Sequence, residues 1–155
     1  MKNFVILIIA FSMISFSAFS QKNPPENVKK EFSKKYSSAQ SVKWENEEKN
    51  EWEAEFKMDG KKMSASFDNS AKWIESETEI TQKELPSSVV MTLNKDFQDY
   101  KKGHIEIFES PEMKGFELGL KKGEASLEVI FDNKGIILKK TNVKEEDEKA
   151  EKVKK

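Results

Sequence analysis

The stretch WEAEFKMDGKKMSASFDNSAKWIE, residues 52–75, decides the fold of this chain. Apolar and polar residues alternate along it on both sides of Asp59-Gly60, a dipeptide typical of tight hairpins. A second turn signal follows at Asp68-Asn69. The stretch therefore predicts antiparallel strands that turn one face to a core and the other to water.

The same pattern recurs in FELGLKKGEASLEVIFDNKGIILK, residues 116–139. A helical spacing of apolar residues precedes each block, first after Pro25 and again after Pro86. The two stripes are Val28, Phe32, Tyr36 and Ala39, and then Val89, Leu93 and Phe97. We predict an α+β fold, a tandem duplication of a helix plus a four-stranded antiparallel sheet, with the helices on one face. The two sheets could be continuous through their edges.

The alternation predicts eight strands, of which the fourth, residues 72–77, resembles an edge strand. The others are expected at residues 41–46, 52–58, 63–67, 104–108, 115–121, 125–131 and 135–139. The predicted division is a signal peptide at residues 1–20, a first unit at 21–80, a second unit at 81–141 and a charged, disordered tail at 142–155.

Residues 1–20 have the features of a secretory signal. Lys2 precedes an apolar run, and small residues stand at Ala18 and Ser20, where a signal peptidase would cleave. The run is short for a membrane span. We therefore expect cleavage near Ser20 and a periplasmic or secreted protein with no membrane span, and an uncleaved anchor is the alternative.

The charge balance argues against nucleic acid as a partner. The chain has 27 Lys and Arg residues against 28 Asp and Glu, so no basic field favours a polyanion. It contains no Cys, so stability must come from an ordinary core rather than from disulfides.

The motifs resemble those of the PepSY-like family, which is described as similar to beta-lactamase inhibitor protein and is common in exported proteins of Bacteroidetes-type bacteria. The residues that carry the resemblance are Pro25, Val28, Phe32, Tyr36, Val42, Trp44, Trp52, Phe56, Gly60, Phe67, Asp68 and Trp73. A weaker second match uses Leu85, Pro86, Val89, Phe97, Phe116, Leu118, Phe131, Asp132 and Gly135. Two departures are Ser37, where the family usually has Pro, and Ala71, where it usually has Gly.

The resemblance implies the fold and an envelope location, and it implies function only by analogy. PepSY-type domains are thought to bind or restrain peptidases, and the inhibitor protein binds beta-lactamases through its open sheet face. The family has no agreed catalytic residues, so none can be carried over to this chain.

The sequence contains no recognisable constellation for catalysis. His104 is the single His, and no nucleophile motif accompanies it. Hairpin chemistry explains Asp68-Asn69 and Asp132-Asn133 better than a metal loop does. We therefore expect no enzyme activity, no catalytic residue, no cofactor and no metal site.

A few residues are candidates for protein binding because of their phase on the strands. If Ile105 and Ile107 face the helices, then His104 and Phe108 face away from them. Ile130 is out of phase in the same way, and Trp73 lies on an edge-like strand. His104, Phe108, Ile130 and Trp73 are the predicted binding residues. The alternative is that Phe108 and Ile130 are covered by the tail or by the other sheet.

These observations predict an exported, non-catalytic protein-binding module that uses the open sheet face, with inhibition of an envelope enzyme or peptidase as one form of that function. The partner is an unknown envelope protein. A periplasmic protein that binds a small ligand, or one for metal stress, with a cleft between the two halves, is the alternative. A homodimer through edge strands is a further possibility.

Overall fold

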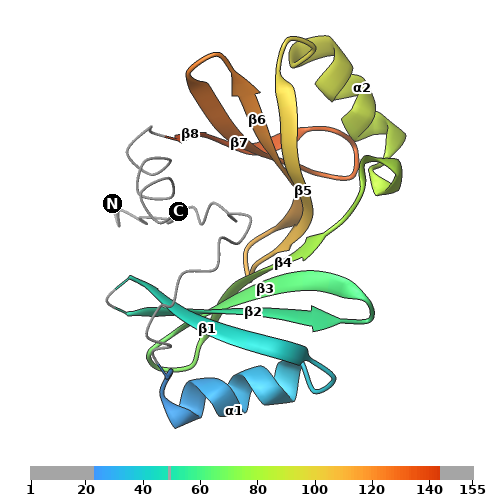
Figure 1. Ribbon diagram of the computed structural model, residues 1–155. Coiled ribbons are helices and arrows are strands. Elements are labelled where there is room, and N and C mark those ends of the chain that lie inside the picture. Colours follow the sequence, from blue (N-terminus) through green and yellow to red (C-terminus); the bar gives the residue numbers. More distant parts are fainter. Residues whose placement is uncertain (1–22, 49, 144–155) are drawn as a thin grey trace.

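The computed structural model describes residues 23–48 and 50–143. One eight-stranded sheet runs in chain order from β1 to β8, with every neighbouring pair antiparallel (Figure 1). The elements are α1 (Glu26–Lys35), β1 (Gln40–Glu48), β2 (Glu51–Met58), β3 (Lys61–Asp68), β4 (Trp73–Glu79), the 3-10 helix η1 (Gln82–Glu84), α2 (Ser87–Asp96), β5 (Lys101–Glu109), β6 (Lys114–Lys122), β7 (Ala125–Phe131) and β8 (Ile137–Val143). The α+β class, with two helices and an antiparallel sheet, is confirmed.

The predicted edge position of β4 is wrong. β4 pairs with β3 on one side and with β5 on the other, from Ser76–Glu109 to Glu79–Glu106. The expected pair of sheets is therefore one continuous sheet. Figure 1 shows that the sheet bends at this joint and that α1 and α2 both lie on the outer side of the bend.

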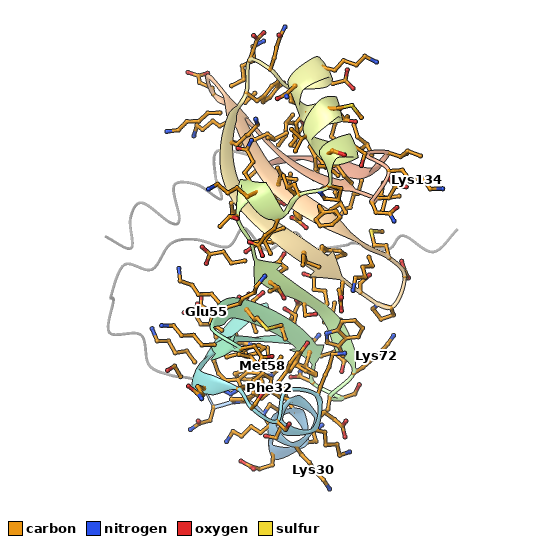
Figure 2. All side chains as sticks on the ribbon, turned by 90° about the vertical axis from the view of Figure 1, so that its right-hand side faces the viewer. Lys30, Phe32, Glu55, Met58, Lys72 and Lys134 are labelled. Atoms are coloured by element: carbon orange, nitrogen blue, oxygen red, sulfur yellow. The ribbon has the colours of Figure 1, made fainter. Side chains whose placement is uncertain are left out.

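Each helix covers its own hydrophobic core. Phe32 and Tyr36 at the end of α1 pack against Phe56 and Phe67 of the strands, and Figure 2 shows Phe32 between the helix and the sheet. Val89 and Leu93 of α2 belong to a second cluster with the apolar residues of β6 and β7. The apolar phase read from the sequence is thus correct on all of these strands.

The turns after β3 and β7 use the same hydrogen bonds. The Asp68 side chain accepts bonds from the backbone N–H groups of Ser70 and Lys72, at 2.8 and 2.9 Å. Asp132 accepts equivalent bonds from Lys134 and Ile136, both at 2.8 Å. Hairpin chemistry, as predicted, accounts for both Asp-Asn pairs.

Each of these turns also binds the helix of its own half. Asn27 of α1 donates a hydrogen bond to the carbonyl of Asn69, at 3.1 Å. Ser88 of α2 donates one to the carbonyl of Asn133, at 2.7 Å. Turn and helix are therefore fixed to one another in the same way in both halves.

Ala71 adopts the backbone conformation of a glycine. Its φ is 69°, close to the 77° of Gly135 at the equivalent position of the other turn. A residue with a Cβ is strained there. Ala71→Gly relieves this strain and should raise the free energy of unfolding by about 0.5–1 kcal/mol. The gain is reduced by the loss of the contact between the Ala71 methyl group and the first core cluster. Urea denaturation would measure this, and a decrease in stability would show that the apolar contact outweighs the strain.

The end of β8 differs from the prediction. The strand runs from Ile137 to Val143, so Asn142 and Val143 are paired with β7 and do not belong to a disordered tail. The rest of the predicted tail and the predicted signal peptide lie outside the described residues. In the part of the chain that the structure describes, no helix has the length and apolar character needed to cross a membrane.

Two strands form the edges of the described sheet, β1 and β8. Ile137 and Leu138 at the start of β8 are exposed, as is Ile136 just before it. An apolar edge strand is suited to pairing with a second copy. The homodimer stays a prediction, which a sizing column would test.

Candidate functional site

The candidate site is the inner face of the sheet, the face opposite α1 and α2. Strand alternation places on it the residues that lie between the core positions. They include Glu53 of β2, Ser64 and Ser66 of β3, Glu75 and Glu77 of β4, His104, Glu106 and Phe108 of β5, Glu117 of β6, and Glu128 and Ile130 of β7. We expected this face to be wet, but most of these residues are buried.

The inner face brings carboxylates together across the strands. Glu106 lies directly opposite Glu79 on β4 and directly opposite Glu117 on β6. Like charges at opposing positions destabilise a sheet when both are ionised. On β3, Ser64 donates a hydrogen bond to Glu77, at 3.1 Å.

Burial changes the ionisation of these carboxyl groups. It raises the pKa of Glu75 and of Glu117 to about 7, and the pKa of Glu106 and of Glu128 to about 8. It also raises the pKa of Glu77 well above its usual range. Neighbouring carboxylates raise the pKa values of Glu75, Glu77, Glu106 and Glu128 further. The Lys139 ammonium group on β8 lowers the pKa values of Glu75, Glu117 and Glu128.

His104 reaches across β6 because residue 119 is glycine. A Cβ on Gly119 would lie 2.5 Å from Cε1 and 2.7 Å from Nδ1 of the imidazole, so a side chain there would collide with the ring. Gly119 is paired with Glu128 on β7, and Glu117 precedes it by two residues on the same face. One ligand atom from each of His104, Glu117 and Glu128 lies within 4.8 Å of the other two. Burial lowers the pKa of His104, which favours the neutral imidazole that can bind a metal.

The structure places three of the four predicted binding residues on one face. His104, Phe108 and Ile130 all lie on the inner face, but Phe108 and Ile130 are only 5% and 3% exposed, so the expected exposure is not found. The two side chains are buried on the inner face, which the alternation had indicated as open. Whether these residues bind a protein stays a prediction.

Trp73 does not lie with the other three. It packs against the first core cluster, and the Lys35 ammonium group of α1 lies 3.9 Å from the centre of its ring. A register shift between Ser66 and Phe67 pairs Trp73 with Phe67. Trp73 therefore lies on the helix side of the sheet, apart from the other three residues, and whether it binds a protein stays a prediction.

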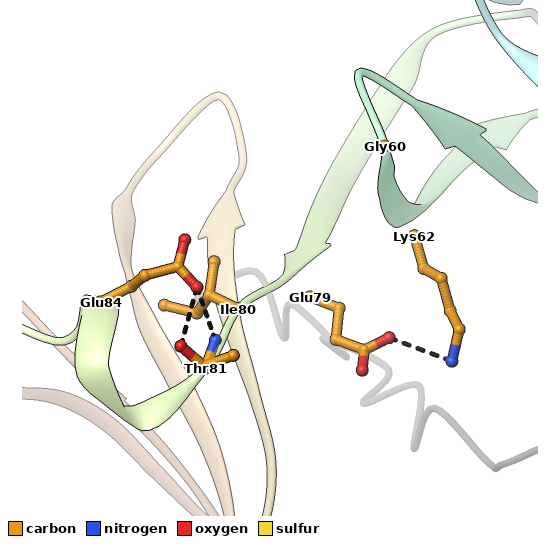
Figure 3. A pocket seen from close by; sticks show the side chains of 6 residues that line it. All are labelled: Gly60, Lys62, Glu79, Ile80, Thr81 and Glu84. Carbon is orange, nitrogen blue, oxygen red and sulfur yellow. Dashed lines mark hydrogen bonds and ion pairs between the residues drawn. The ribbon is translucent and has the colours of Figure 1, made fainter.

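A pocket of about 260 Å³ lies where the two halves meet (Figure 3). Its charged groups are already paired: Lys62 lies 3.2 Å from Glu79, and Lys61 lies 2.7 Å from Glu84. Hydrogen bonds from Lys61 and from Thr81 lower the pKa of Glu84 to about 2. These pairs join the start of β3 to the end of β4 and to η1, so every charged side chain that lines the pocket already has a partner.

The sequence interpretation missed Glu117 and Glu128. Both alternate with core residues, which is the pattern of a solvated strand face. The available signal was Gly119, because a glycine inside a strand often marks the close approach of another group. The single imidazole of the chain was the group to look for.

A family model matches the chain over residues 12–63 and 50–139; its description is "Putative beta-lactamase-inhibitor-like, PepSY-like". Together the two matches extend over most of the sequence. A search of curated proteins found no relative.

Several solved structures share the fold. A "BLIP-like protein" from Bacteroides fragilis superposes with a TM-score of 0.69 at 23% identity, and the match covers 80% of this chain and 89% of that one. A DUF2874 family protein from Bacteroides ovatus gives 0.70 at 21% identity, covering 79% and 89%. A protein from Bacteroides eggerthii, called "putative periplasmic", gives 0.70 at 22% identity, covering 80% and 92%. At these identities the likeness shows the fold alone.

Proposed function

Since the chain belongs to the PepSY-like family, we propose that it is an exported, non-catalytic protein-binding module that acts through the inner face of its sheet. Inhibition of an envelope enzyme or peptidase is one form that this binding would take. The signal-like sequence at residues 1–20 supports export, and the periplasmic description of the Bacteroides eggerthii protein agrees with it.

The observation that carries the proposal is the row of buried carboxyl groups on the inner face. A folding core does not need them, because burying a carboxylate costs stability unless it is paired or protonated. Groups with strongly shifted pKa values cluster at functional sites more often than elsewhere. The inner face is such a cluster, and both helices of the described chain lie on the other side of the sheet.

The chemistry of the inner face indicates the kind of partner. Carboxylates that gain a Lys or Arg counterion ionise again and form charge-assisted hydrogen bonds. We therefore expect a partner that presents a basic segment. Because Glu75 and Glu77 are buried in this structure, binding requires the inner face to open, and slow association with a steep temperature dependence is the expected kinetic signature.

The test begins with a pull-down from envelope extract and continues with the affinity of the captured protein. Glu75→Gln with Glu77→Gln should weaken binding at least about tenfold, because two counterions of the partner are lost. Glu26→Gln with Glu31→Gln makes the same two substitutions on α1, on the other side of the sheet, and should leave binding unchanged. Equal effects of the two pairs would contradict the inner face as the binding surface.

We also propose that the two halves arose by duplication of one helix-plus-four-strand unit. The element order repeats, and so do the Asp68 and Asp132 turns and the bonds from Asn27 and Ser88 to those turns. The units correspond to residues 21–80 and 81–141. The signal peptide at 1–20 and the charged tail beyond β8 belong to the same proposal.

A further inference from the structure

We propose that His104, Glu117 and Glu128 bind one divalent transition-metal ion, of the zinc class, on the inner face of the sheet. The three side chains come from adjacent strands, β5, β6 and β7. The inference does not rest on the proposed protein binding, since the site uses neither Glu75 nor Glu77.

The geometry is close to that of a three-ligand metal site. Zinc lies about 2.0–2.2 Å from imidazole and carboxylate ligands, which puts the ligand atoms about 3.3–3.5 Å apart in a tetrahedral arrangement. Here the ligand atoms are within 4.8 Å of one another, so they need to approach by up to about 1.5 Å. Gly119 leaves the room through which the imidazole reaches the two carboxylates.

A second observation points to a missing ligand. Glu128 is only 4% exposed, and its Oε2 atom has no hydrogen-bond partner among the described residues. The same is true of Oε2 of Glu106, which is 2% exposed and lies opposite Glu117. Buried carboxylate oxygens are normally paired or bound to a metal. A cation bound by Glu128 and Glu117 would give Oε2 of Glu128 a partner.

The donor set selects the class of metal. One imidazole nitrogen with two carboxylate oxygens suits zinc, manganese or iron(II), whereas calcium and magnesium prefer oxygen ligands alone. Three protein ligands also leave a coordination position for water or for a group of a partner. The Lys139 ammonium group, whose charge acts on both Glu117 and Glu128, opposes the binding of any cation.

The test uses the untagged protein, stripped of metal with a chelator and titrated with zinc chloride against a chromophoric competitor. We expect one equivalent to bind. Because the chain has a single His, the imidazole proton signals in the NMR spectrum report on His104 alone, and they should shift with the same stoichiometry. No binding, or binding that leaves these signals unchanged, would refute the proposal.

Four variants locate the site. His104→Asn and Glu128→Gln should each weaken zinc binding by on the order of 100-fold. Gly119→Ala should weaken it as well, because the new methyl group displaces a side-chain ring rather than backbone, so the fold should survive. Lys139→Met should tighten binding several-fold. Circular dichroism checks that each variant is folded.

Glu124→Gln, in the exposed turn between β6 and β7, is the matched control and should bind zinc as the unmodified protein does. Unchanged affinity in Glu128→Gln and in His104→Asn would place the zinc elsewhere and overturn the assignment. Loss of partner binding in the Glu75 and Glu77 variant with intact zinc binding would leave the metal site standing, so the two proposals fail separately.

Discussion

Raising the pH from 5 to 8 should destabilise this protein, by about 3 kcal/mol or more in the free energy of unfolding. The carboxyl groups of Glu75, Glu106, Glu117 and Glu128 keep their protons in the folded state up to a pKa of about 7 to 8. In the unfolded chain they release them near their ordinary value of about 4.5. Between the pKa values of the unfolded and the folded state, the folded state binds more protons. The stabilisation is therefore complete below the pKa of the unfolded chain and decreases as the pH rises toward the pKa of the folded state.

Two kinds of group act in the opposite direction at lower pH. Burial lowers the pKa of His104, so acidification below its ordinary value favours unfolding. Burial alone would raise the pKa of Asp68, but hydrogen bonds from Ser70 and Lys72 bring it below its ordinary value, and their contribution is lost in acid. The stability maximum is therefore expected near pH 5 to 6.

Thermal melts with a chelator present would measure the effect, and we expect the melting temperature to drop by at least roughly 10 °C between pH 5 and pH 8. Glu106→Gln is neutral at every pH, so it should stabilise the protein at pH 8 and change little at pH 5. Glu124→Gln is the exposed control. A melting temperature that stays constant from pH 5 to pH 8 would mean that the inner carboxylates are ionised and compensated in the folded state.

Gly135→Ala should destabilise the protein by about 3 kcal/mol or more. The backbone φ at Gly135 is +77°, and a Cβ there would lie 2.5 Å from the carbonyl oxygen of Ser88 and 2.8 Å from its carbon. Those are backbone atoms of α2, so they cannot move aside without moving the helix. The shift would also disturb the bonds from Thr92 to Gly135 and from Ser88 to Asn133.

Gly60→Ala is the matched control for this experiment. Its φ is +78°, but a Cβ there would meet nothing within 4 Å. It should cost only about 1 kcal/mol, the strain of the left-handed conformation. Denaturation with urea gives both values. Equal losses of unfolding free energy in Gly135→Ala and Gly60→Ala would show that α2 moves freely and that the turn around Gly135 is not fixed against this helix.

The local structure could be predicted from the sequence because it depends on nearby residues. The Asp59-Gly60 hairpin, the two Asp-Asn turns and the phase of the core residues all follow from alternation and turn chemistry. Ala71 occupies a position where the family usually has glycine, yet the turn still forms. The N–H of Ala71 donates a hydrogen bond to the carbonyl of Asp68, at 2.9 Å. Asp68 fixes the turn strongly enough to hold an alanine there.

The central place of β4 depends on a contact that local patterns do not encode. Its inner residues are Glu75, Glu77 and Glu79, which look like the solvent side of an edge strand. Glu75 and Glu77 are nevertheless buried, on a strand that pairs with β5 across the joint. A solvent-exposed polar face and a buried acidic face give the same alternation of apolar and polar residues. The sequence alone could therefore not distinguish them.

The cluster proposed to bind a metal could not be predicted for the same reason. His104, Glu117 and Glu128 lie on three strands, and the distances between them depend on the register of β5 with β6 and of β6 with β7. A register shift between Lys102 and Ile105 affects the position of His104 directly. Irregularities of this kind leave no pattern in the sequence apart from the glycine that accommodates the ring.

The order of the strands has a consequence for how quickly the protein folds. Every strand pairs with the strand next to it in the chain, from β1 through β8, so no pairing has to wait for a distant segment. A low contact order of this kind favours fast folding for an antiparallel protein. The chain contains no Cys, so no disulfide has to form. The first hairpin and α1 can assemble while the second half is still unfolded, so growth of the sheet from one end is the expected pathway.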